Sequence, residues 1–192
     1  MYFDLLDEQA IKDGVFVIQK SKKPIDILVN VAGIALDALF HMVTMEQLKK
    51  TFDINFFSQI YFTQYITKLM LRNPNGGSVV NISSISALDG NTGQLSYASS
   101  KAALIAATKT MSAELAPKNI RVNAVAPALI ETKMLEKFEF VPESTKMAML
   151  AEMPMGLGTI DDVTSAIIFL LSDASRFITG TSLLVDGGYC AQ

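Results

Sequence analysis

The stretch Ser78-Val79-Val80-Asn81-Ile82-Ser83-Ser84 has the composition of a strand buried inside a protein. Short runs of this kind, apolar on both faces, are typical of strands in a parallel sheet that helices cover on both sides. Similar runs occur at 25–32, 119–125 and 181–185. The chain is therefore expected to contribute four strands to one sheet.

Helical stretches separate the four runs. They cover 8–21, 45–72, about 96–116, and a segment from Thr159 to about Leu171 in which Thr159 and Asp162 have the spacing of a capping box. Strands that alternate with helices predict an α/β fold with a Rossmann-like, doubly wound parallel sheet. No repeat or linker divides the sequence, so residues 1–192 are expected to form a single domain.

Composition excludes several classes of protein. The 192 residues carry a formal net charge of −3 with acids and bases mixed, which argues against a nucleic-acid-binding face. No apolar run approaches the roughly 18 residues that a membrane span needs, and the acidic start resembles no leader peptide, so we expect a cytoplasmic protein. One histidine, His41, and one cysteine, Cys190, argue against a His/Cys metal site and an internal disulfide.

Tyr97 and Lys101 are the first candidates for chemistry. They are four residues apart near the start of a predicted helix, so their side chains share one face. An ammonium group beside a phenol favours the phenolate, so we expect Lys101 to lower the pKa of Tyr97 from about 10. Tyr97 would then exchange a proton with a substrate oxygen. The spacing alone fits a surface contact equally well.

Two further polar residues are placed where a ligand would bind. Ser84 lies at the carboxyl end of a predicted strand, where open α/β sheets bind ligands, and its hydroxyl can bond a carbonyl or an alcohol. Asn55 lies among aromatic residues in the predicted 45–72 helix, and a buried amide must be hydrogen-bonded. It would hold a water against Lys101, or be satisfied by neighbouring backbone, which is the favoured alternative for this residue alone.

Several motifs together resemble the short-chain dehydrogenases/reductases in order and spacing. They are Asn30-Val31-Ala32-Gly33, Asn55, Ser84, Tyr97-Ala98-Ser99-Ser100-Lys101, Asn123-Ala124-Val125-Ala126-Pro127, and the ending from Ile178-Thr179-Gly180-Thr181 to Asp186-Gly187-Gly188. The resemblance covers essentially the whole chain. It implies an NAD(P)-dependent oxidoreductase that interconverts a small-molecule ketone and an alcohol by hydride transfer.

The resemblance also implies roles for individual residues. Tyr97 would be the general acid/base, Ser84 would polarise the substrate oxygen, Lys101 would bind the nicotinamide ribose, and Asn55 would anchor a proton-relay water. Ser83 is the rival serine, but neighbouring strand residues face opposite ways, and the thirteen-residue spacing to Tyr97 favours Ser84. The cofactor would border Asp4, Leu5, Asn30, Ala32, Gly33, Tyr97, Lys101, Pro127, Ile130 and Thr132.

The start of the chain departs from the family pattern. The glycine-rich turn that binds the pyrophosphate has no counterpart, and Phe3-Asp4-Leu5 resembles the end of the family's third strand. We therefore expect an N-terminally truncated sheet that lacks the first two strands, an exposed edge at 25–32, self-association or low stability, and weak cofactor binding. The alternative function is a catalytically dead fragment that acts as an oligomerising or binding module.

Within the family, 119–132 and 177–188 most resemble the 3-oxoacyl-acyl-carrier-protein reductases of fatty acid biosynthesis. Those enzymes reduce a β-keto thioester with NADPH, which slightly favours NADP over NAD and points to a ketone or an acyl-carrier-protein thioester as substrate. Methionines in 133–155 suit an acyl chain, although ordinary helix packing is the favoured alternative. The aromatic residues of 45–72 suit a homo-oligomer interface, which we expect, or the internal core.

Overall fold

A computed structural model describes residues 2–132, 147 and 150–191 of the chain. Its strands are β1 (Ile27–Asn30), β2 (Gly77–Ile82), β3 (Ile120–Pro127) and β4 (Ser182–Val185). They form one parallel sheet in the order β1-β2-β3-β4, so each strand pairs with the next one along the chain. The four predicted strands and the parallel α/β fold are confirmed.

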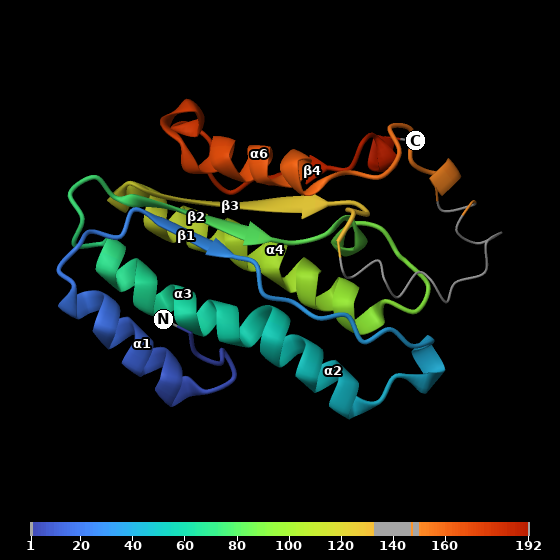
Figure 1. Cartoon of the computed structure of the whole chain (residues 1–192), viewed down its shortest axis with the longest axis horizontal. Helices are drawn as coiled ribbons and strands as arrows, with labels where there is room; N and C mark the ends of the chain where they lie inside the picture. The colour runs from blue at the N-terminus through green and yellow to red at the C-terminus, as the bar shows by residue number, and fades with distance from the viewer. Residues whose placement is uncertain (1, 133–146, 148–149, 192) are drawn as a thin grey trace.

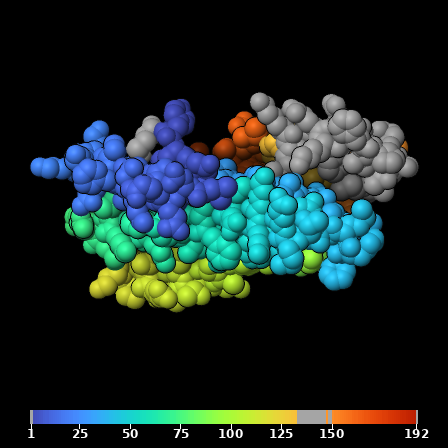
Figure 2. All heavy atoms as spheres, turned by 90° about the horizontal axis from the view of Figure 1, so that it is seen from below, coloured from blue at the N-terminus to red at the C-terminus, as the bar shows by residue number. Residues whose placement is uncertain are grey.

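Helices cover both faces of the sheet (Figure 1). α1 (Glu8–Lys20), α2 (Met45–Phe52), α3 (Ser58–Met70) and α4 (Leu95–Leu115) lie on one side, and α6 (Ile160–Leu171) lies on the other. Figure 2 shows the outer surface of the first side, where the α2–α3 stretch lies between α1 and α4. The predicted capping box is present, because Thr159 and Asp162 bond each other's backbone at the start of α6.

Apolar side chains fill both layers between the sheet and its helices. Val79 and Val80 are neighbours in β2, face opposite layers, and are each 0% exposed. Alternation of this kind in a strand buried on both faces explains why the run shows no polar period. Complete burial of a side chain such as Met70 or Leu170 contributes roughly 1.5–3 kcal/mol to stability.

The predicted 45–72 helix is continuous but irregular. α2 and α3 are joined by a π-helical turn, Asp53–Phe57, which the spacing of apolar residues did not reveal. The wider turn carries Asn55, which is 0% exposed. Single π turns inside helices recur at functional sites, and this one brings the Asn55 amide into contact with Ile34, beyond β1, and with Ser100 of α4.

Arg121 of β3 fastens the α6 layer to the sheet. Its Nη1 donates to the Leu170 carbonyl at 2.7 Å and to Ser175 Oγ at 2.9 Å, and its Nη2 donates to the Ser172 carbonyl at 3.2 Å. The last carbonyls of a helix have no partner within it, and a cation there also suits the helix dipole. These hydrogen bonds hold the carboxyl end of α6 over β3.

The start of the chain is not a strand, contrary to the expectation for Phe3-Asp4-Leu5. Asp4 Oδ1 accepts a hydrogen bond from the Leu6 backbone at 2.9 Å, in a turn that leads into α1. The Phe3 ring packs on Gly14 of α1 and lies 5.6 Å from the Phe62 ring of α3. A strand needs a neighbour for its backbone groups, and no described strand adjoins this segment.

β1 is the edge of the described sheet, as predicted for 25–32. Ile27 is 51% exposed, and Val31, just beyond the strand, is 64% exposed. Leu28 and Asn30, which alternate with these residues, are buried toward α3. The exposed side of β1 thus carries apolar side chains without cover from the described residues.

Candidate active site

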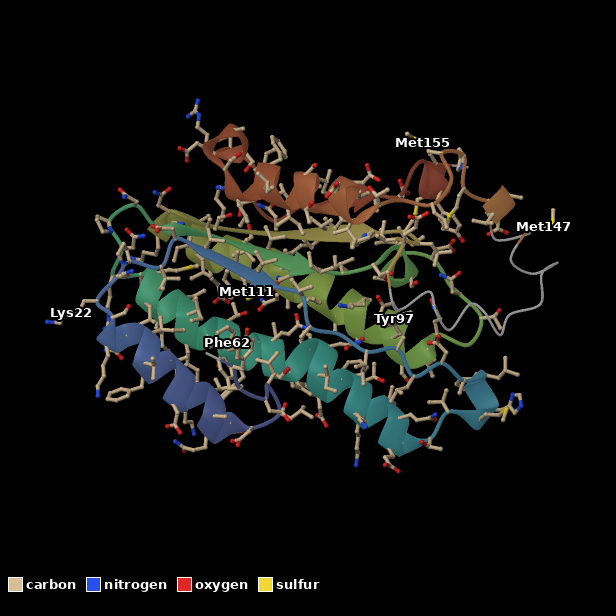
Figure 3. All side chains as sticks on the ribbon, in the orientation of Figure 1. Lys22, Phe62, Tyr97, Met111, Met147 and Met155 are labelled. Atoms are coloured by element: carbon tan, nitrogen blue, oxygen red, sulfur yellow. The ribbon has the colours of Figure 1, made fainter. Side chains whose placement is uncertain are left out.

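The candidate residues come from separate elements at one end of the sheet. Tyr97 and Lys101 lie in the first two turns of α4, Ser84 follows β2, and Asn55 lies in the π turn. Tyr97 is found at the end of the molecule toward which the strand arrows point (Figures 1 and 3). Carboxyl ends of parallel strands are the usual ligand-binding edge of an α/β sheet.

Lys101 is buried at this edge, with 3% of its surface exposed. Its Nζ donates to the Ile82 carbonyl at 2.7 Å, at the end of β2. A Cβ added to Gly33 would lie 3.3 Å from this Nζ and 3.5 Å from Asn55 Oδ1. Burial lowers the pKa of Lys101 to about 8, because the charged form loses its hydration.

The pKa of Tyr97 is raised, so the expectation that Lys101 lowers it is not met. Burial is the main cause, a hydrogen bond with Ser84 opposes it, and the charge of Asp37 adds to it. The Lys101 ammonium lies 5.8 Å from the centroid of the Tyr97 ring and is bonded to a backbone carbonyl, so it does not offset the loss of water. At neutral pH Tyr97 is a protonated phenol, which suits it to donate a proton.

The two neighbouring serines form hydrogen bonds with different partners. Ser83 Oγ donates to the backbone carbonyl of Lys101 at 3.0 Å and is 2% exposed. Ser84 bonds Tyr97, and its Oγ accepts a hydrogen bond from the Ser86 backbone at 3.2 Å. Ser84 therefore belongs to the tyrosine cluster, whereas Ser83 anchors α4 to the end of β2.

The side chain of Asn55 is satisfied by protein groups. Its Nδ2 donates to the Ile34 carbonyl at 2.9 Å and to Ser100 Oγ at 3.0 Å, and its Oδ1 accepts from the Ile34 backbone at 2.8 Å. This is the arrangement given above as the alternative for this residue. It ties the backbone after β1 to the first turns of α4.

The three expected cofactor residues near the end of β1 differ in their surroundings. Asn30 is 5% exposed, and its Nδ2 donates at 2.8 Å to both Thr63 Oγ1 and Asn81 Oδ1, inside the helix layer. The Ala32 carbonyl accepts a hydrogen bond from Gln59. Of the three, Gly33 is the one that adjoins Lys101.

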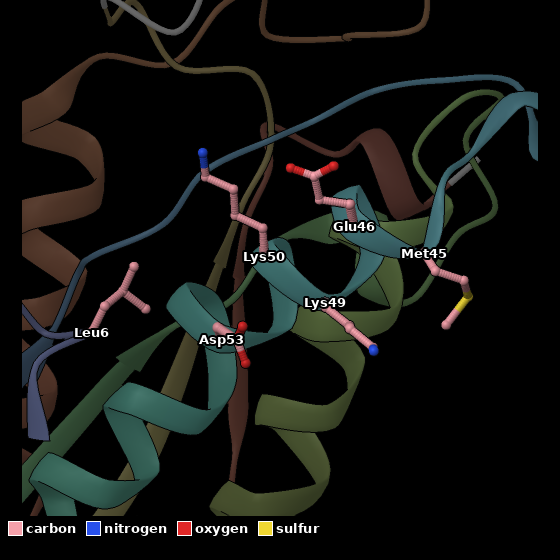
Figure 4. Close-up of a pocket in the computed structure, with 6 residues that line it drawn as sticks. All are labelled: Leu6, Met45, Glu46, Lys49, Lys50 and Asp53. Carbon is pink, nitrogen blue, oxygen red and sulfur yellow. The ribbon is translucent and has the colours of Figure 1, made fainter.

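The other expected cofactor residues are spread over two regions. Pro127 ends β3, Ile130 forms a bridge with Gly158, and Thr132 is exposed. Asp4 is exposed and Leu5 is half-buried before α1, where Leu6 lines a pocket whose other walls are Met45, Glu46, Lys49, Lys50 and Asp53 (Figure 4). This pocket does not contain Tyr97 or Lys101. Most of 133–155, the segment whose methionines were expected to suit an acyl chain, lies outside the described residues.

Sequence reasoning missed a polar shell around Ser84. Ser86 Oγ donates to Gln94 Oε1 at 2.8 Å and accepts from Asn91 Nδ2 at 3.2 Å, and Ser84 Oγ donates to Ser86 Oγ at 3.2 Å. The position of Gln94, three residues and so one helical turn before Tyr97, was the available signal. These contacts hold the Ser84 side chain in place next to Tyr97.

Two absences hold for residues 2–132, 147 and 150–191. No helix there is long and apolar enough to cross a membrane. No group of three or more His, Cys, Asp and Glu side chains in the same residues is placed to hold a metal ion.

Comparison with known proteins places the chain in a family. A family model described as enoyl-(acyl carrier protein) reductase matches residues 1–190. The 3-oxoacyl-acyl-carrier-protein reductase FabG of Thermotoga maritima is 41% identical over 186 residues, which cover 96% of this chain and 74% of that protein. The acetoacetyl-CoA reductase of Rhizobium meliloti is 37% identical over 188 residues, with 97% and 76% covered. A solved structure of ElxO with NADP bound has a TM-score of 0.89 at 35% identity, and covers 99% of this chain and 77% of that one. The chain belongs to the short-chain dehydrogenase/reductase family.

Proposed function

We propose that this chain reduces a ketone to an alcohol with NADPH or NADH, and that the preferred ketone is a 3-oxoacyl thioester. The observation that carries the proposal is the half-buried Tyr97 phenol, bonded to Ser84 and one helical turn from the buried Lys101. A proton donor next to a hydroxyl that binds an oxygen is what carbonyl reduction requires of a protein.

The similar proteins support the substrate and the cofactor. Two of them are named as reductases of a 3-oxoacyl-acyl-carrier-protein and of acetoacetyl-CoA, and both substrates are β-keto thioesters. ElxO holds NADP in its structure. By this likeness we favour NADPH over NADH.

The residues at the end of β1 and in α4 fit the nicotinamide half of a dinucleotide. Gly33 presents backbone without a side chain next to Lys101 Nζ, and one N–H of Lys101 is used by Ile82, which leaves two for the ribose hydroxyls. Pro127, Ile130 and Thr132 would border the carboxamide, and Asp4 and Leu5 the adenine. No described glycine-rich turn joins a strand to a helix for the pyrophosphate, which supports weak binding.

The chain's own residues would manage the proton. When bound, the reduced nicotinamide supplies the hydride for the carbonyl carbon. Ser84 would bind the carbonyl oxygen, and Tyr97 would give that oxygen its proton, since a raised pKa keeps the phenol protonated at neutral pH. Lys101 would orient the ribose, and Asn55 would hold the backbone near Gly33 against α4.

The proposal is tested by turnover of acetoacetyl-CoA with NADPH and with NADH. Tyr97→Phe should lower kcat by about 10²–10⁴, the usual contribution of a general acid. Tyr61→Phe is the matched control, since Tyr61 is half-buried on α3 and its hydroxyl bonds Tyr65 of the same helix. Equal rates in wild type and Tyr97→Phe, or no turnover by the wild-type chain, would overturn the proposal.

A homo-oligomer remains part of the proposal. Phe52, Phe56 and Phe57 contact one another around the π turn, and Phe57 is 55% exposed. Tyr61, Phe62 and Tyr65 pack instead against the core cluster that contains α1. The exposed ring is the part of this helix that supports contact with a second copy.

A further inference from the structure

Gln59 is a buried amide in the first turn of α3, with 1% of its surface exposed. Its Nε2 donates to the Ala32 carbonyl at 2.6 Å, to the Asn55 carbonyl at 2.9 Å and to the Ile54 carbonyl at 3.3 Å. Its Oε1 is buried and has no hydrogen-bond partner. An amide with both N–H groups engaged and its oxygen unpaired is costly, since an unmade buried hydrogen bond costs roughly 1–3 kcal/mol.

The carbonyls that Gln59 binds belong to two segments that lie near Lys101. Ala32 precedes Gly33, whose backbone adjoins Lys101 Nζ, and Asn55 bonds Ile34 on the other side of that glycine. The Gln59 amide therefore joins the end of β1 to the π turn. Without this donor, the Ala32 and Asn55 carbonyls would need another partner, and water is the one available.

We propose that Gln59 is a positioning residue for Lys101. The Gln59 amide holds the Ala32–Gly33 backbone in place, and this backbone forms the wall that excludes water from the Lys101 ammonium. The Asn55 amide fixes the other end of the same wall through Ile34. The assignment of a use for Lys101 in the reaction rests on the proposed function, whereas the geometry of the wall does not.

The first test measures the titration of Lys101 by NMR of ¹⁵N-labelled lysine side chains, with no substrate or cofactor. Gln59→Leu should admit water, so the pKa of Lys101 should rise from about 8 toward its ordinary value of 10.5. The groups that act on this part of the site are Tyr97, whose ring adjoins the ammonium, and Asp37, which acts on Tyr97, and both are unchanged in the variant. Gln64→Leu, at an exposed position of the same helix, is the control and should leave the titration unchanged.

A second readout follows the wall itself. Hydrogen exchange of the Ile34 amide, which donates to Asn55 Oδ1 at 2.8 Å, should become about tenfold faster in Gln59→Leu, the effect of weakening one hydrogen bond. If Gln59→Leu does not fold, Gln59→Asn gives the same comparison, because its shorter amide does not reach both carbonyls. An unchanged Lys101 titration and unchanged Ile34 exchange in the folded variant would overturn the inference.

The outcome is independent of whether the chain turns over a ketone. A shifted Lys101 titration in a chain without activity would support the positioning role and count against the proposed function. Normal turnover with an unshifted titration would support the function and reject the positioning role. Where turnover is measurable, Gln59→Leu should lower kcat more than it raises KM, because the altered group is not a substrate contact.

Discussion

The carboxyl end of β2 and the edge strand β1 differ in how far their side chains are buried and bonded by other residues. At the carboxyl end of β2, Ser83, Ser84 and Lys101 are at most 8% exposed, and each has a hydrogen bond to another described residue. Along β1, Ile27 is 51% exposed and the following Val31 is 64% exposed. Both regions come from the same kind of apolar strand.

The difference shows that Ser83, Ser84 and Lys101 are held by contacts within α4, β2 and the turn that follows β2. These contacts do not involve the exposed side of β1, so changes there should leave these three residues in place. A site held by short internal hydrogen bonds is preorganised, and preorganisation is a large part of how proteins stabilise transition states. The following changes probe the two regions separately.

After Tyr97→Phe, the largest expected effect separates the two serines. Ser84→Ala should lower kcat for acetoacetyl-CoA by about 10²-fold, because it removes the hydroxyl proposed to bind the carbonyl oxygen. Ser83→Ala should leave kcat nearly unchanged and cost about 1 kcal/mol of stability, since it removes one buried hydrogen bond to α4. Steady-state kinetics and urea unfolding of both variants check this, and the reverse pattern would reassign the serines.

Lys101→Met should stabilise the fold while it impairs the reaction. Because its pKa falls from 10.5 to about 8 on folding, the unfolded chain binds more protons between these values, and the free energy of unfolding rises with pH across that window. At neutral pH the buried charge is a net cost, so Lys101→Met should raise the free energy of unfolding by about 1–3 kcal/mol.

Unfolding by urea at pH values on either side of this window gives the measurement. The wild-type chain should gain stability as the pH rises through it, and Lys101→Met should lack that gain. A variant less stable than wild type at neutral pH would contradict the assigned burial cost.

Changes at the exposed edge strand β1 should have the smallest effect on ketone reduction. Val31→Lys and Ile27→Lys place charges on the exposed side of β1, and charged side chains on an edge oppose strand pairing between molecules. Each should reduce self-association in sedimentation velocity, while the free energy of unfolding changes by less than about 0.5 kcal/mol. A large loss of ketone reduction in either variant would mean that the two regions are coupled.

Sequence patterns predicted the regular helices and strands well, because the residue types that form and bury each element are local in the sequence. The strand Gly77–Ile82 and the capping box of Thr159 each follow from local residue types. The π turn at Asp53–Phe57 did not, because one extra residue in a turn leaves the composition unchanged. Phe3-Asp4-Leu5 was wrongly read as a strand, since its apolar residues pack on α1 and α3 instead.

The site was predictable in its members but not in its electrostatics. Tyr97, Ser84 and Lys101 were selected by spacing, and the structure brings them together. The direction of the Tyr97 pKa depends on burial and on where the ammonium points, which no spacing encodes. Gln59 and Ser86 act through contacts with backbone or with loop residues, so their side chains had no distinctive position in the sequence.

The assignment of a dinucleotide site beside Lys101 is tested most directly by fluorescence titration of NADPH, since the chain has no tryptophan to interfere. We expect saturable binding by the wild-type chain, weakened about tenfold in Lys101→Met, the effect of losing about 1.4 kcal/mol of contacts. Asp4→Ala, at the distant end of the proposed site, should have the smaller effect. Absence of saturable binding, or equal affinity of wild type and Lys101→Met, would contradict the assignment.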